Sequence, residues 1–101
     1  MEKKIRVLVK APGCRAKSAL IANELKAMQD IVGGYIEAVP LASDAAIVCN
    51  EEGRLLRLPY NCMICGMEFY GTVILAGVDR DELCDVPDGL ECLGGAFRDV
   101  L

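Results

Sequence analysis

Cysteine is the residue type in this sequence with the clearest potential for chemistry. Cys62 and Cys65 form a C-x-x-C pair, which can supply two thiolates to zinc or act as a redox dithiol. A closed zinc site usually has four ligands, and the sequence contains no histidine. The other ligands would have to be cysteines, either Cys84 with Cys92 or Cys14 with Cys49. Because neither pair repeats the C-x-x-C spacing, a metal-binding module and a redox pair stay hypotheses beside ordinary free thiols.

Catalytic side chains of other types are scarce. The chain has no histidine, its only serines are Ser18 and Ser43, and no base is placed to activate a cysteine. We therefore expect a protein that is not an enzyme and that carries no cofactor.

An acidic run covers residues 79–91, and its candidate interaction residues are Asp79, Asp81, Glu82 and Asp85. An EF-hand calcium loop would need glycine at its sixth position and glutamate at its twelfth, where this run has Cys84 and Leu90. The run therefore predicts a solvated acidic surface. Its functional alternative is an inhibitor that mimics DNA toward a basic DNA-binding protein.

A second candidate interaction surface lies in the stretch NEEGRLLRLPYN, and its residues are Arg54, Arg57, Tyr60 and Asn61. Tyrosine and asparagine in turns often hydrogen-bond to nearby backbone instead. Both interpretations stay open for this stretch.

The charge and composition limit the function classes. The net charge is -4, and residues 68–101 carry two basic and eight acidic side chains against nine and seven in residues 1–67. This balance argues against direct binding of nucleic acid, which relies on clustered Lys and Arg. No apolar run approaches the ~18 residues of a membrane helix, and the N-terminus lacks a signal-peptide cleavage site. We expect one cytoplasmic domain over residues 1–101, without membrane association.

The elements of the first half follow from apolar spacing. Residues 5–11 are rich in β-branched side chains and predict a strand, and residues 18–22 predict a short returning strand. Asn23 is expected to cap a helix that ends at Gly33. Leu25, Met28 and Val32 would form its apolar stripe.

The paired glycines Gly33 and Gly34 stand between that helix and the next strand, and they could mark a ligand loop or a helix end. A phosphate cradle needs glycines before a helix N-terminus, whereas here the helix comes first. The order favours a helix C-cap that needs a positive φ.

The second half predicts more strands. Residues 35–41 form a strand that Pro40 places at an end or an edge, and residues 45–50 are expected to return as residues 54–58 in a hairpin with Gly53 in its turn. The run GTVILAGV, residues 71–78, predicts a central, covered strand beside residues 5–11. After Val86 and Pro87, a C-terminal helix could use the apolar positions Leu90, Leu93, Phe97 and Val100.

Three ordered motifs, LKAMQDIVGGYIEAVPL, AAIVCNEEGRLLRLPYN and FYGTVILAGVD, resemble the domain-of-unknown-function family 3846. The resemblance spans residues 5–79. It implies kinship with small proteins of anaerobic bacteria, their phages and mobile elements. It brings no catalytic residues, because that family has no assigned activity.

The fold predicted from these elements is α+β, a mostly antiparallel sheet of about five to six strands with one main helix on a face. The expected function is a non-enzymatic accessory or protein-interaction domain associated with mobile elements. Because residues 5–11 and 54–58 lack proline, one of these strands could lie at a sheet edge and pair two copies as a homodimer. Protection of that edge by Arg54, Arg57 and Lys10 would instead keep the chain monomeric.

Overall fold

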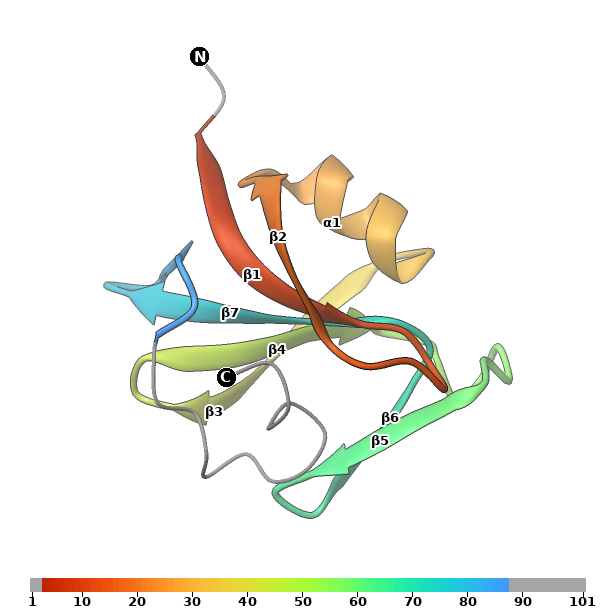
Figure 1. The fold of residues 1–101 in the computed structure, drawn as a ribbon. Coiled ribbons are helices and arrows are strands. Elements are labelled where there is room, and N and C mark those ends of the chain that lie inside the picture. The colour runs from red at the N-terminus through yellow and green to blue at the C-terminus, as the bar shows by residue number, and fades with distance from the viewer. Residues whose placement is uncertain (1–2, 88–101) are drawn as a thin grey trace.

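The main sheet of the protein is antiparallel and has six strands among the described residues, and a two-stranded hairpin packs against it (Figure 1). The computed structural model describes residues 3–87. Its elements in chain order are β1 (Lys4–Lys10), β2 (Lys17–Ala22), α1 (Leu25–Val32), β3 (Ile36–Ala42), β4 (Ala45–Asn50), β5 (Tyr60–Ile64), β6 (Met67–Tyr70), β7 (Val73–Asp79) and β8 (Glu82–Cys84). The strand order is β2-β1-β7-β4-β3, and β8 pairs with β7. The predicted antiparallel sheet with one helix is confirmed.

Strands β7 and β4 form the centre of the sheet because their side chains are apolar on both faces. β7 lies between β1 and β4, and residues 73–76 are all fully buried. Val73 and Leu75 belong to the core on one face, whereas Ile74 and Ala76 belong to the core on the other. The prediction of a central, covered strand beside the first strand is confirmed.

Helix α1 covers one face of this sheet (Figure 1). Met28 and Val32 are buried there against side chains of β1, β4 and β7. The predicted start of the helix is wrong, because Glu24 is the N-cap residue and makes no side-chain cap. The side chain of Asn23 instead donates a hydrogen bond to the Leu83 carbonyl at 2.9 Å. Leu25, expected in the apolar stripe, is exposed.

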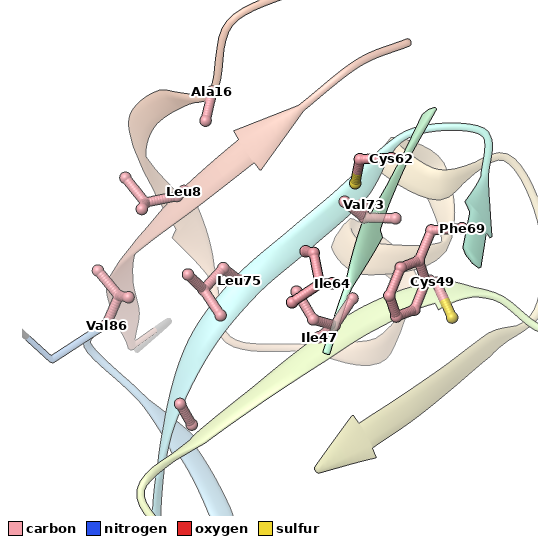
Figure 2. Packing of buried hydrophobic residues seen from close by; sticks show 11 residues of the cluster. Leu8, Ala16, Ile47, Cys49, Cys62, Ile64, Phe69, Val73, Leu75 and Val86 are labelled. Carbon is pink, nitrogen blue, oxygen red and sulfur yellow. The ribbon is translucent and has the colours of Figure 1, made fainter. Parts of the chain in front are cut away.

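The hairpin of β5 and β6 covers the opposite face, where the sequence predicts only a loop. Cys62, Ile64 and Phe69 point from the hairpin toward Ile47 of β4 and Leu75 of β7 (Figure 2). Buried and exposed side chains alternate along Cys62, Met63 and Ile64 because one face of the hairpin meets the sheet.

The predicted hairpin of residues 45–50 with residues 54–58 is wrong. β4 pairs with β3 and β7 instead, and residues 51–57 form turns. Gly53 also lacks the positive φ expected of it. A Cβ there would lie 2.8 Å from the Tyr70 carbonyl oxygen, so close packing against β6 explains this glycine.

The segment after β8 fills the space beside β1 that β7 leaves open. β1 pairs with β7 only over residues 8–10. Beyond that point the Asp85 carboxylate accepts a hydrogen bond from the Arg6 backbone N–H at 2.8 Å, and the Val86 N–H donates to the Arg6 carbonyl at 2.8 Å. The predicted C-terminal helix lies outside the described residues, apart from Val86 and Pro87, which are not helical.

The described part of the chain, residues 3–87, contains no helix that is long and apolar enough to cross a membrane.

Candidate interaction surface

Residues 51–58, here named the leucine loop, connect β4 to β5 and are held by backbone hydrogen bonds. The Leu56 N–H donates to Glu52, and the Leu58 N–H donates to Gly53. The Asn50 side chain supports the start of the loop by accepting a hydrogen bond from the Glu52 N–H at 2.8 Å. The backbone of the loop is therefore an ordered turn.

Two adjacent leucines occupy the tip of the leucine loop and face solvent. Leu55 is 81% exposed and Leu56 is 55% exposed. Leu58, at the end of the loop, packs instead next to Gly71. Burying one of the exposed leucines on a partner would gain about 1.5–3 kcal/mol.

An aromatic and charged cluster lies beside the loop. The Arg54 guanidinium lies over the Tyr70 ring at 5.1 Å from its centroid, and its Nη2 is 3.3 Å from Glu68 Oε2. The Tyr70 hydroxyl donates to the same carboxylate oxygen at 3.0 Å, and this hydrogen bond raises the pKa of Tyr70. The Tyr60 ring meets the Tyr70 ring edge to face at 5.5 Å. Arg54, Tyr60, Glu68 and Tyr70 are here named the Arg54 cluster.

The leucine loop separates two hollows of the surface. One of about 490 Å³ lies toward the end of α1, and Tyr35, Glu52 and Leu56 line it together with Asp30 and the paired glycines. The other, of about 410 Å³, lies between β3 and β6, and its charged lining residues are Glu37, Glu51, Arg54 and Glu68. The loop is thus a ridge with a recess on either side.

The paired glycines serve the end of α1. Gly33 has φ 83°, and its N–H donates to the Gln29 carbonyl at 2.8 Å. Gly34 is needed for a different reason, because a Cβ there would lie 2.9 Å from Asn50 Nδ2, which donates to the Val32 carbonyl. The C-cap interpretation is confirmed for Gly33.

Replacing Gly33 is expected to cost stability through backbone strain alone, because no atom lies within 4 Å of the position that a Cβ would take there. We expect Gly33→Ala to lower the free energy of unfolding by about 1 kcal/mol, Gly33→Val by more, and Gly33→Asn by least. Urea titration of the three variants measures this order. A larger loss for Gly33→Asn than for Gly33→Ala would contradict it.

The two groups of residues predicted as interaction surfaces lie at opposite ends of β7. Asn61 donates to the Gly71 carbonyl just before β7 begins, whereas Asp79 ends the strand. At about 3.3 Å per residue, the ends of this strand are about 20 Å apart. The structure therefore does not bring the basic and acidic groups together.

The exposure and contacts of the single residues differ within both predicted interaction surfaces. Arg54, Arg57 and Tyr60 are exposed, whereas Asn61 is buried in β5 and bonded to the backbone carbonyls of Lys10 and Gly71. Asp79, Asp81 and Glu82 are exposed around the turn between β7 and β8, and the Asp85 carboxylate binds the Arg6 backbone. Glu68, Tyr70, Leu55 and Leu56 were not predicted as site residues.

The C-x-x-C pair is divided between two environments. Cys62 is buried in the core, whereas Cys65 is exposed in the turn between β5 and β6. Burial raises the pKa of Cys62, although the Lys10 ammonium opposes this. Among residues 3–87, no group of three or more cysteine, aspartate or glutamate side chains could hold a metal ion.

The other described cysteines also lie in different environments. Cys14 is exposed, and Cys84 is half-buried at the end of β8. Burial, with a smaller contribution from the Glu37 carboxylate, raises the pKa of the Cys49 thiol to about 11. A thiolate is thus disfavoured at Cys49 and at Cys62, and Cys92 lies outside the described residues.

Comparison with known proteins gives a family and no activity. A family model described as a domain of unknown function, DUF3846, matches residues 5–94. No curated protein and no solved structure matches the chain. The resemblance seen in the three sequence motifs is thereby confirmed, and the chain belongs to the DUF3846 family.

Proposed function

We propose that this chain is a small, non-enzymatic protein-interaction domain that binds its partner through the leucine loop and the Arg54 cluster. The observation that carries the proposal is the exposure of Leu55 and Leu56 on a loop fixed by backbone hydrogen bonds. An ordered apolar tip that no other part of residues 3–87 covers marks an interaction site more strongly than scattered surface leucines do.

The residue types around the loop support this proposal. Arginine and tyrosine are enriched among the residues that dominate binding energy, and here Arg54, Tyr60 and Tyr70 hold one another in place. Because these contacts already restrain the three side chains, association would cost less side-chain entropy than it would for side chains without such contacts. The two hollows offer recesses for partner side chains on either side of the ridge.

The charges define the partner's surface. Among the charged residues lining the two hollows, Arg54 offsets Glu68, and the nearby Lys26 pairs with Asp30 at 2.8 Å. Within residues 3–87, the lining residues Glu37, Glu51 and Glu52 form no side-chain ion pair that would offset their charge. The partner's contact surface would therefore be an apolar patch with basic residues at its rim. An association with bacterial mobile elements is part of the proposal and rests on the sequence resemblance.

Leu55→Asp and Leu56→Asp should each weaken binding at least about tenfold, because a carboxylate replaces apolar area at the contact. Both positions are exposed, so we expect the free energy of unfolding to change by less than about 0.5 kcal/mol. The measurement is quantitative capture of proteins from a host lysate on the immobilised chain and its variants, followed by titration of the captured partner.

The matched control neutralises the acidic turn with Asp79→Asn, Asp81→Asn and Glu82→Gln combined. This variant should retain the same partner, because the turn lies at the far end of β7. If the partner is instead lost from the control and kept by the leucine variants, binding uses the acidic surface, as the DNA-mimic alternative requires. Stoichiometric zinc in the protein purified without chelator would support the metal-binding alternative.

A further inference from the structure

The two edges of the main sheet differ in how they are protected. β3, at one edge, contains Pro40, which lacks an N–H, and its register shifts between Pro40 and Ala42. Both features hinder pairing with another strand. β2, at the other edge, has the sequence KSALIA, with no proline and a single charge at its first residue. Among the described residues β2 pairs only with β1, so within that part of the chain its outer edge is open to a further strand.

Apolar side chains accompany this edge on both faces of the sheet. Leu20 lies opposite Arg6 in the ladder and is 70% exposed. On the other face, a hollow of about 450 Å³ lies beside β2, and its apolar lining residues include Val9, Ala19, Ile21 and Ile31. A strand added to β2 would therefore gain both backbone hydrogen bonds and apolar contacts.

We propose that β2 is a self-association edge, and that two copies of the chain join their sheets by antiparallel pairing of β2 with β2. This inference is independent of the proposed partner site, which lies on the leucine loop. It also replaces the two edges expected from the sequence, because β1 is paired on both sides and residues 54–58 are not a strand.

The sequence of β2 suits pairing with itself. Directly opposite residues in an antiparallel ladder point to the same face, so a two-fold axis perpendicular to the sheet can pass at Leu20. Leu20 then meets Leu20 of the second copy, and Ala19 meets Ile21. Each of these pairs is apolar, and cross-strand apolar pairs stabilise sheets.

The charge at the start of β2 is compatible with the same arrangement. Antiparallel pairing centred at Leu20 places Lys17 of one copy opposite Asn23 of the other, twice in each dimer. Parallel pairing in register would instead place Lys17 beside Lys17, and like charges directly opposite each other destabilise a sheet.

Sedimentation equilibrium of the full chain over a hundredfold dilution series tests the proposal. The mass should rise from 10.9 kDa toward twice that value as the concentration increases. Leu20→Lys should weaken the dimer at least tenfold, because two ammonium groups would meet at the axis. Leu55→Lys, at an exposed leucine on the leucine loop, is the matched control and should leave the dimer unchanged.

A mass of 10.9 kDa at every concentration would overturn the proposal, as would a dimer that Leu55→Lys abolishes and Leu20→Lys does not. Neither result would affect the leucine-loop proposal's own capture experiment, so the two proposals can fail separately.

Discussion

Gly77→Ala is expected to lower the free energy of unfolding by about 3 kcal/mol, at the upper end of the usual cost of overpacking an interior. Gly77 is buried in β7 opposite Cys84 of β8. A Cβ at this position would collide with the Asp85 carbonyl oxygen and would lie 3.0 Å from the Cys84 Sγ. A backbone carbonyl cannot rotate away as a side chain can, and Asp85 is itself tied to Arg6 of β1.

Gly66→Ala provides the matched control, measured in the same urea titration. Gly66 has φ 80°, and no atom lies within 4 Å of the position of its missing Cβ. Alanine there should cost only backbone strain, about 1 kcal/mol. Equal losses for the two variants would show that the segment after β8 moves aside without cost, and would contradict the tight packing beside β1.

The central strand could be predicted from the sequence because burial on both faces leaves a continuous apolar run. Residues 73–76 read Val-Ile-Leu-Ala, and each face of the sheet receives two of them. The end of the helix could be predicted from the sequence as well, since a glycine that follows an apolar helical stripe has few structural roles other than a C-cap. At both positions the local sequence was sufficient to predict the structure.

The hairpin of β5 and β6 was missed because its turn residues are unusual. Cys65 and Gly66 both have positive φ, which is the requirement of a type I′ turn. Asparagine or aspartate usually precedes the glycine in such turns, so Cys-Gly gave no hairpin signal. The same C-x-x-C sequence is typical of metal and redox sites, although here its two thiols lie in different environments.

The leucine loop was mistaken for a strand because RLLRL alternates imperfectly and contains no glycine or proline. Its true conformation depends on contacts distant in sequence, such as the approach of Gly53 to Tyr70. For the same reason the Arg54 cluster could be predicted only in part. Arg54 and Glu68 are 14 residues apart, and they meet only because β6 folds back along β5.

Asn61 illustrates how a predicted surface residue can have a structural role instead. It lies at the start of the hairpin, where the chain leaves the leucine loop and β5 begins. Its Nδ2 donates to the Lys10 and Gly71 carbonyls, each at 2.8 Å, and its Oδ1 accepts from the Lys10 Nζ at 2.9 Å. One side chain thereby joins the hairpin to β1 and to the segment before β7.

Asn61→Ala is therefore expected to lower the free energy of unfolding by about 3 kcal/mol, because it removes the amide donor from two carbonyls at a largely buried site. Lys10→Met is the matched control: it removes only the ammonium donor, preserves most of the side-chain length, and should cost about 1 kcal/mol. Urea titration of both variants gives the comparison. If Asn61→Ala cost no more than Lys10→Met, water would be replacing the amide, and the junction between hairpin and sheet would be open to solvent. A larger loss for Asn61→Ala would show that this amide holds the start of β5, which includes Tyr60 of the Arg54 cluster, against β1 and the segment before β7.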